Sequence, residues 1–185
     1  MRIYLVRHGE SEANVAGIIN DDPYRPVALT LRGCHQAESA AAALREVAFT
    51  HAYSSQFLRA RQTADIILAT LGPALPLRLD PRLNERRSGL DGQPVEAFNG
   101  LVRPDPVRIR PAAGESFLEE MARVGWFFDD AVQRHPEAVV LAVSHENPIL
   151  AVAALAGRPV EEAARGGLGN CEWIVVDWPA PATVG

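Results

Sequence analysis

The sequence predicts an α/β fold, a three-layer α/β/α sandwich with a mostly parallel central sheet. Short apolar runs alternate along the chain with longer segments of helical periodicity, and this alternation favours parallel strands joined by right-handed helical crossovers. The 185 residues are also 48% hydrophobic and 22% charged, which is typical of a globular chain that buries a core and forms a cleft. We therefore expect a single domain over residues 1–185.

Five segments have the length and composition of buried strands. The first begins the chain and is followed at once by polar residues, whereas the fourth is an unbroken run of apolar residues. In chain order the predicted strands are Arg2–Val6, His51–Ser54, Leu75–Leu79, Ala138–Val143 and Cys171–Asp177.

Four longer segments have helical periodicity and recognisable end signals. Thr30 is a candidate N-cap for the first helix, and Gly72 with Pro73 is expected to end the second. The predicted helices are Leu31–Val47, Phe57–Leu71, Glu115–Arg134 and Asn147–Leu155.

The segment 80–114 is long, irregular and rich in Pro, Gly and Arg, with one weak helical patch at Pro94–Asn99. Irregular segments of this length often carry function, and we interpret this one as a substrate lid. Its arginines indicate either a second anion-binding pocket or a solvated basic face, and the solvated face is favoured. They are Arg86, Arg87, Arg103, Arg108 and Arg110.

Composition excludes several classes of function. No stretch approaches the roughly 20 apolar residues of a membrane span, and the start of the chain does not resemble a signal peptide, so a cytoplasmic location is expected. The net charge of −5 opposes binding to nucleic acid. All 18 basic residues are arginine, which rules out lysine Schiff-base chemistry. Cys34 and Cys171 are interpreted as buried thiols.

Polar residues follow three of the predicted strands. Ligands of α/β sheets bind beyond the carboxyl ends of the strands, and the sequence places Arg7 and His8, Ser55, and Ser144 with His145 at such ends. Both histidines are therefore expected in one cleft. A metal site is the competing interpretation, but the chain has no helical His-x-x-x-His or paired-cysteine spacing, and adjacent arginines repel a cation. We predict no metal.

Several of these residues belong to longer motifs that together resemble the histidine phosphatase superfamily, also called the phosphoglycerate mutase-like family. The motifs fall in the family's order across nearly the whole chain. They are Arg7-His8-Gly9-Glu10, the run from Ser55 to Ala64 that contains Arg59, Leu83-Asn84-Glu85-Arg86, Gly114-Glu115-Ser116, and Val143-Ser144-His145.

The resemblance implies a phosphoglycerate mutase-like fold, no cofactor, and a phosphohistidine formed on His8. It also implies that Arg7 and Arg59 bind the phosphoryl group, that His145 stabilises it as a hydrogen-bond donor, and that Glu85 acts as general acid and then base. These residue types suit the chemistry, because guanidinium groups bind phosphoryl oxygens bidentately and stay charged, and a carboxyl group can protonate a leaving alkoxide. The alternative for Glu85 is a surface salt bridge with a neighbouring arginine.

Four further residues are candidate substrate-binding groups. Ser11 and Asn14 follow the first strand and can add neutral hydrogen bonds, and Arg86 belongs to the possible second anion pocket. Glu146 stands where many family members have glycine. Its carboxylate can bind a substrate hydroxyl or amine, compete with Glu85 as the acid, or cap the last predicted helix.

The predicted function is a metal-independent phosphatase that hydrolyses a small-molecule phosphomonoester. The alternatives are a phosphoglycerate mutase or other phosphotransferase, a phosphohistidine protein phosphatase, and a catalytically silent binding protein. Ser88 stands where family mutases have an aromatic residue, and the chain lacks lysine and the length for their insertions, so hydrolysis is favoured. We expect no nucleic-acid or membrane partner, and the sequence leaves a homodimer open.

Overall fold

The computed structural model describes residues 1–72 and 75–178. The strands are β1 (Arg2–Arg7), β2 (His51–Ser54), β3 (Leu77–Leu79), β4 (Val139–Ser144) and β5 (Trp173–Asp177). They form one sheet in the order β3-β2-β4-β1-β5. The pairs β1–β4, β2–β4 and β2–β3 are parallel, and β5 is antiparallel to β1. The predicted α/β class with a mostly parallel sheet is confirmed.

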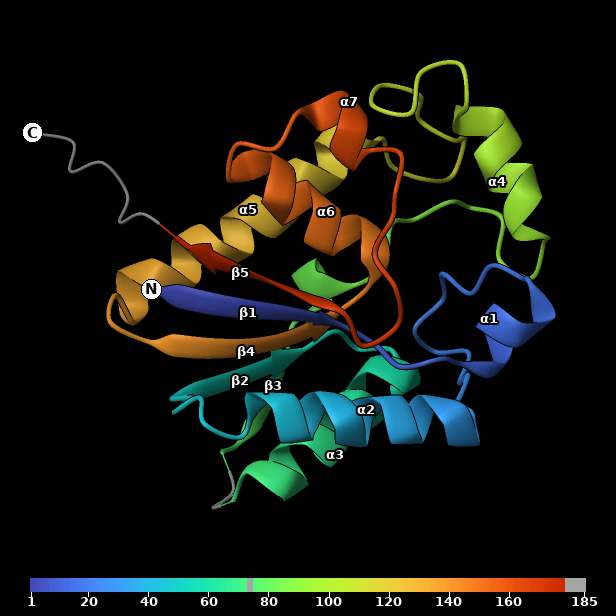
Figure 1. The fold of residues 1–185 in the computed structure, drawn as a ribbon. Helices are drawn as coiled ribbons and strands as arrows, with labels where there is room; N and C mark the ends of the chain where they lie inside the picture. The colour runs from blue at the N-terminus through green and yellow to red at the C-terminus, as the bar shows by residue number, and fades with distance from the viewer. Residues whose placement is uncertain (73–74, 179–185) are drawn as a thin grey trace, which may run out of the picture.

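The longer helices cover both faces of this sheet, as Figure 1 shows. They are α2 (Leu31–Leu44), α3 (Leu58–Leu71), α5 (Phe117–Arg134) and α6 (Glu146–Leu155). Helices α2 and α3 lie on one face, and α5 and α6 on the other. Thr30 caps α2 as predicted, since its side chain accepts a hydrogen bond from the Gly33 amide at 3.0 Å. Gly72 follows α3 as expected, whereas Pro73 lies outside the described residues.

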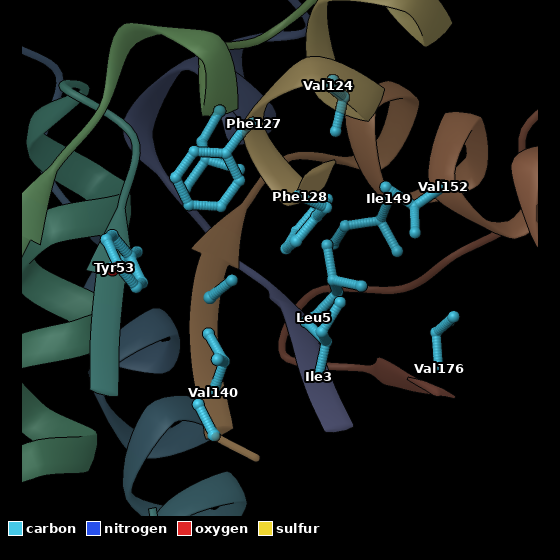
Figure 2. Close-up of a cluster of buried hydrophobic side chains, with 13 residues drawn as sticks. Ile3, Leu5, Tyr53, Val124, Phe127, Phe128, Val140, Ile149, Val152 and Val176 are labelled. Carbon is cyan, nitrogen blue, oxygen red and sulfur yellow. The ribbon is translucent and has the colours of Figure 1, made fainter. Parts of the chain in front are cut away.

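Two apolar layers hold the helices to the sheet. On the α5 face, Phe127 and Phe128 pack with Leu5 of β1 and are almost completely buried (Figure 2). On the other face, small alanines of α2 such as Ala37 let that helix approach the sheet, and Ile67 of α3 fills the space beside them. As a result, the carboxyl ends of the parallel strands are fixed together at one end of the sheet.

Four short elements complete the fold: α1 (Glu12–Ala16), the 3-10 helix at Pro81–Leu83, α4 (Val95–Val102) and α7 (Val160–Ala163). The helical patch expected at Pro94–Asn99 is observed as α4, which begins at Val95 and extends to Val102. The five residues of α1 are too few to show a period in the sequence, although Ser11 and Asn14 form a reciprocal capping box at its start. Helices α1 and α4 both lie at the end of the sheet towards which β1 runs (Figure 1).

The antiparallel direction of β5 follows from the path of the preceding chain. After α6 and α7 the chain returns to the carboxyl end of β1, where the Cys171 amide donates to the Arg7 carbonyl at 3.1 Å. Strand β5 then starts beside Val6 and ends beside Arg2. As a result, the loop 164–172 passes over the edge of the sheet at which the predicted site residues meet.

Two further expectations concern exposure and membranes. Cys171 is buried, as expected, but Cys34 is only partly buried because it lies near the exposed start of α2. Among the described helices, none is long and apolar enough to cross a membrane.

Candidate active site

A cavity of about 320 Å³ opens at the carboxyl edge of the sheet. It is lined by the end of β1, the start of α3, the segment after β3, and helices α1 and α4. The predicted site residues that line it are Arg7, His8, Ser11, Asn14, Arg59, Glu85, Arg86 and Glu146. His145 does not line the cavity. It is fully buried, and its Nδ1 lies 3.2 Å from Arg59 Nη2.

His8 is held in one tautomer by its neighbour. Its Nδ1 lies 2.7 Å from the Gly9 carbonyl oxygen, and because a carbonyl only accepts, Nδ1 must carry the proton. The other nitrogen, Nε2, then keeps its lone pair, which accepts a hydrogen bond from Arg59 Nε at 3.1 Å; this contact must open before the lone pair can attack phosphorus. Burial, and next the charge of Arg59, hold the pKa of His8 well below its usual value. The ring is therefore neutral and nucleophilic at neutral pH.

Arg59 links the two histidines. It lies in the first turn of α3, where Nη1 donates to Asn20 Oδ1 at 2.5 Å and Nη2 donates to His145 Nδ1 at 3.2 Å. Burial lowers the pKa of Arg59 to about 10, so the guanidinium stays charged at neutral pH. This charge lies directly against the proposed nucleophile, where a phosphoryl group in transfer would need it.

His145 is held by hydrogen bonds at both ring nitrogens. Since Nδ1 accepts from Arg59, the proton of the neutral ring is on Nε2, which donates to Ser55 Oγ at 2.8 Å. Burial and the charge of Arg59 hold the pKa of His145 well below its usual value. Both ring nitrogens are thus engaged by protein groups and neither faces the cavity, so the hydrogen bond predicted from His145 to a phosphoryl group stays a prediction.

Glu85 lies in the cavity wall, which it shares with Arg7, His8 and Arg59. Its Oε1 accepts from the Arg86 amide at 2.8 Å and from Asn147 Nδ2 at 3.3 Å. Burial raises the pKa of Glu85 above its usual value, against the opposing effect of the Arg86 amide. Within the described chain no arginine forms an ion pair with Glu85, and Arg87 pairs instead with Glu115 at 3.6 Å. The geometry thus favours a proton-carrying carboxyl group over a surface salt bridge.

Glu146 and Arg7 form an ion pair at the loop before β5. The distance from Arg7 Nη1 to Glu146 Oε2 is 3.2 Å, and Nη1 also donates to the Leu168 carbonyl. Glu146 Oε1 accepts from the amides of Gly167 at 2.7 Å and Leu168 at 3.2 Å. The carboxylate therefore holds the loop and not the amides of its own helix. Arg7 Nε is buried and has no hydrogen-bond partner in the described residues.

The glycines of this loop are required by its shape. Gly166 and Gly167 have φ of +84° and +118°, and a Cβ on Gly166 would lie 2.9 Å from Glu146 Oε1. A side chain at either position would be strained. The loop is thus fitted around the Glu146 carboxylate.

Ser11 and Asn14 line the cavity, but they also bond to each other. Asn14 Oδ1 accepts from the Ser11 amide and hydroxyl, each at 3.0 Å. These contacts fix the start of α1 beside His8. Contact with a substrate would involve the side-chain amide nitrogen of Asn14, Nδ2, which is not used in this pair.

Arg86 differs from the other arginines of its segment. It is buried, and its guanidinium donates to the carbonyls of Pro106, Ile109 and Glu115 at 3.4, 3.2 and 3.1 Å. For Arg86 the solvated-face interpretation is therefore wrong, because the side chain organises the segment 106–115. The remaining members are exposed, as that interpretation expects: Arg87, Arg103, Arg108 and Arg110.

Sequence reasoning missed residues that support the site from outside the strand ends. Asn20 binds Arg59, Thr63 Oγ1 accepts from the Gly9 amide at 3.0 Å, and Asn147 binds Glu85. Asn20 lies in a loop with no signal in the sequence. Thr63 and Asn147 lie near recognised residues, but only the fold shows which atoms they contact. In the described residues no group of three or more His, Cys, Asp or Glu side chains could hold a metal ion.

Comparison with known proteins gives a family match and several similar proteins. Residues 3–183 match the family model of the histidine phosphatase superfamily (branch 1). The adenosylcobalamin/alpha-ribazole phosphatase of Escherichia coli (strain K12) is 31% identical over 171 residues, covering 87% of this chain and 82% of the relative. A probable phosphoglycerate mutase of Yersinia pestis (strain Pestoides F) is 32% identical over 187 residues, covering 96% and 85%.

Solved structures show the same similarity. A mycobacterial glucosyl-3-phosphoglycerate phosphatase, in complex with VO3, superposes with a TM-score of 0.82 at 28% identity, covering 94% of this chain and 90% of that one. A putative alpha-ribazole-5'-P phosphatase from Escherichia coli gives a TM-score of 0.79 at 29% identity, covering 95% and 89%. With its family match, its phosphatase relatives and its paired histidines at one sheet edge, the chain belongs to the histidine phosphatase superfamily.

Proposed function

We propose that this protein is a phosphatase that hydrolyses a small-molecule phosphomonoester through a phosphohistidine on His8. The observation that carries the proposal is the fixed tautomer of His8, with Nδ1–H on the Gly9 carbonyl and the Nε2 lone pair next to Arg59 at the cavity. A neutral imidazole with a directed lone pair is what nucleophilic attack on phosphorus needs. Two arginines, Arg7 and Arg59, supply positive charge for the phosphoryl oxygens.

The reaction would proceed in two displacements. In the first, the Nε2 lone pair of His8 forms the N–P bond, the ester P–O bond breaks, and protonated Glu85 gives its proton to the departing oxygen. In the second, ionised Glu85 takes a proton from water, the water oxygen attacks phosphorus, and the N–P bond breaks to return the lone pair to His8. The raised pKa of Glu85 supports its role as acid in the first step.

The cavity wall supports a substrate with an apolar group on the alcohol side. Besides the charged residues, the cavity is lined by apolar side chains, several of them from α4 and the loop after α1, and by the side-chain amides of Asn20 and Asn99, which can hydrogen-bond. The named phosphatase relatives act on different alcohols, so the wall itself is the better guide to this chain. Its apolar members are Ala13, Ile18, Ile19, Val95, Phe98, Val102 and Ala164.

Hydrolysis is favoured over transfer to a second hydroxyl. One relative is a probable phosphoglycerate mutase, but the polar side chain of Ser88 lines the cavity, at the position where mutases of the family have an aromatic residue. Its hydroxyl donates to Asp21 Oδ2 at 2.6 Å. A mutase would return the phosphoryl group to substrate and release little phosphate.

The test is phosphate release from a panel of phosphomonoesters, measured for the native chain, His8→Ala and His35→Ala. His35 is an exposed histidine of α2 and serves as the matched control. We expect the His8→Ala variant to lose more than about 1,000-fold in rate and to form no acid-labile phosphoenzyme, whereas His35→Ala keeps both. Phosphoenzyme without phosphate release would favour the phosphotransferase, and equal release by both variants would refute a role for His8.

A further inference from the structure

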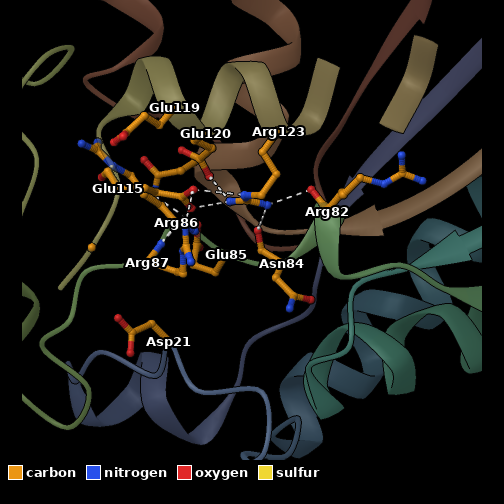
Figure 3. A network of polar contacts seen from close by, with 12 residues as sticks. Asp21, Arg82, Asn84, Glu85, Arg86, Arg87, Glu115, Glu119, Glu120 and Arg123 are labelled. Atoms are coloured by element: carbon orange, nitrogen blue, oxygen red, sulfur yellow. Dashed lines mark hydrogen bonds and ion pairs between the residues drawn. The ribbon is translucent and has the colours of Figure 1, made fainter. Parts of the chain in front are cut away.

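The backbone of the segment that carries Glu85 is hydrogen-bonded to Glu115, which precedes α5, and to Arg123 of that helix. Figure 3 shows Arg123 and Glu115 facing the backbone of residues 82–87, on the side away from Asp21. Glu115 is almost completely buried, and so is Glu120 within α5. A buried charged cluster this close to a proposed proton donor is a candidate for more than a structural role.

Arg123 makes the central contacts of this cluster. Its Nη1 donates to the carbonyls of Arg82 at 2.8 Å and Asn84 at 3.0 Å. One guanidinium nitrogen therefore bridges the two peptide groups that precede Glu85. These two hydrogen bonds fix the backbone immediately before Glu85.

Glu115 fixes the other side of the acid and orients Arg123. Its two carboxylate oxygens accept from Arg123 at 2.5 and 3.1 Å, and Oε1 also accepts from the Arg87 amide at 3.1 Å. The backbone joins as well, since the Glu115 amide donates to the Arg87 carbonyl at 2.9 Å. The approach is close enough that a Cβ on Gly114 would lie 2.4 Å from the Arg87 carbonyl oxygen.

These contacts hold the backbone on both sides of Glu85. Residues 82 and 84 are held by Arg123, residue 87 is held by Glu115, and the Glu85 carboxyl is then directed by the Arg86 amide and Asn147. A general acid must lie within hydrogen-bond reach of the oxygen it protonates. Small displacements of such a group cost much of its catalytic effect.

We propose that Arg123, oriented by Glu115, is a positioning residue that places the Glu85 carboxyl at the leaving-group oxygen. The inference rests on the proposed function, since it assumes that Glu85 is the proton donor. Arg123 itself touches no substrate and does not line the cavity. Its effect is confined to steps in which Glu85 moves a proton.

The test compares two esters of similar size in the Arg123→Lys variant. Lysine keeps the positive charge beside Glu115 but cannot donate to both carbonyls and both carboxylate oxygens at once. We compare kcat/KM, which reports only the steps up to release of the alcohol, because Glu85 also acts as the base in the later step shared by both esters. For 2-phenylethyl phosphate, whose alkoxide needs a proton, we expect kcat/KM to fall about 30-fold or more. For 4-nitrophenyl phosphate, whose phenolate leaves unaided, we expect a loss of less than about 3-fold.

Controls separate this inference from the proposed function. Glu85→Gln tests the acid itself and should show the same difference between esters, and Arg134→Lys, an exposed arginine of the same helix bound only to Asp130 among described residues, should show none. If Glu85→Gln lowers kcat/KM equally for both esters, the proposed acid role fails. If Glu85→Gln discriminates between the esters and Arg123→Lys does not, the positioning role is overturned while the function stands.

A second variant guards against loss of folding. Glu115→Gln keeps an acceptor for the Arg87 amide and removes one acceptor from Arg123, so we expect the same ester-dependent loss with a smaller size. Thermal unfolding of each variant shows whether it is folded. An equal loss on both esters in folded Glu115→Gln and Arg123→Lys would overturn the proposal, because a merely structural role predicts that result.

Discussion

Glu146 connects the end of the first strand to the loop that precedes the last one. Its carboxylate has three donors within hydrogen-bonding reach: Arg7 and the amides of Gly167 and Leu168. The pair is partly buried, with side-chain exposures of 17% for Arg7 and 26% for Glu146, so solvent screens it less than an exposed pair. We expect this carboxylate to keep the loop closed over the cavity.

Replacing Glu146 should loosen the loop without unfolding the protein. In Glu146→Ala the two loop amides lose their acceptor, and the loop should open more often. Trypsin can then cleave the backbone after Arg165, an exposed residue beside those amides. We expect cleavage after Arg165 to become at least about 5-fold faster, which corresponds to a loss of about 1 kcal/mol in local stability. Timed digestion followed by mass spectrometry measures this rate.

The matched control for that digestion is Glu161→Ala, which removes the same charge from an exposed position in α7. Equal rates of cleavage after Arg165 in Glu146→Ala and the native chain would show that the ion pair does not hold the loop. A faster rate in both variants would attribute the effect to net charge.

How well the residues of the site could be predicted depended on where they lie. His8 and His145 follow strands, and the rule that ligands bind at the carboxyl ends of strands brings both to one edge. Asn20 could not be found in this way, because its contact with Arg59 joins residues 39 positions apart in the chain. The partners of Glu146 were likewise hidden, since they lie on a loop whose path depends on β5.

At the scale of elements, α5 combines a strong sequence signal with a feature that the sequence does not explain. Its Ser116–Glu119 capping box and apolar face predict the helix well. Yet Glu120 lies on the buried side, fully enclosed, with neither carboxylate oxygen hydrogen-bonded in the described structure. Its nearest cation is Arg123 at 3.6 Å, which is already paired with Glu115.

Glu120 should cost stability at neutral pH. Burial raises the pKa of Glu120 well above the 4.5 of an exposed glutamate, so the folded state binds more protons than the unfolded state once the pH exceeds that value. Stability is then lost as the pH rises. We expect Glu120→Met to stabilise the protein by about 1–3 kcal/mol at pH 8 and by much less at pH 4, measured by denaturant unfolding at both values.

Glu38→Met is the control for that measurement, since Glu38 is an exposed glutamate of α2 and its replacement should be nearly neutral at both pH values. A destabilised Glu120→Met variant at pH 8 would mean that the carboxylate contributes through Arg123 or Arg86. A gain that does not change with pH would mean that improved packing, and not the buried acid, is responsible.

The boundaries of the elements could be predicted better than their direction. Strands β1, β2 and β4 lie within a residue or two of their expected ranges because each is a compact apolar run. The alternation of strands and helices gave no sign that β5 is antiparallel, since that depends on the length of chain between α6 and β5. The small helix α1 was missed because its five residues are too few to show a helical period.

At the scale of the whole molecule, the cavity combines charged residues at the end of the sheet with apolar residues of α4. Phe98 of α4 is one of these, and the Arg86 guanidinium lies 5.1 Å from its ring. In Phe98→Ala we expect kcat/KM to fall about 10-fold for 1-naphthyl phosphate and much less for phenyl phosphate. The two leaving groups have similar acidity, so the comparison reports contact with the wall.

Leu101→Ala is the control in the same helix, because Leu101 is exposed and does not line the cavity. It should leave both esters unchanged. If Phe98→Ala reduces activity on both esters equally, the alcohol group does not reach α4.

The position of α4 has a consequence for how such an enzyme changes its substrate. The helix supplies Val95, Phe98, Asn99 and Val102 to the cavity wall, but none of the residues assigned here to phosphoryl transfer. On the proposed function, α4 contributes to the choice of alcohol from a stretch of the gene that holds none of the residues proposed for the chemistry. The eight residues of α4 form a cassette, and a library randomised in that cassette alone should yield variants with new preferences and an unaltered phosphohistidine cycle.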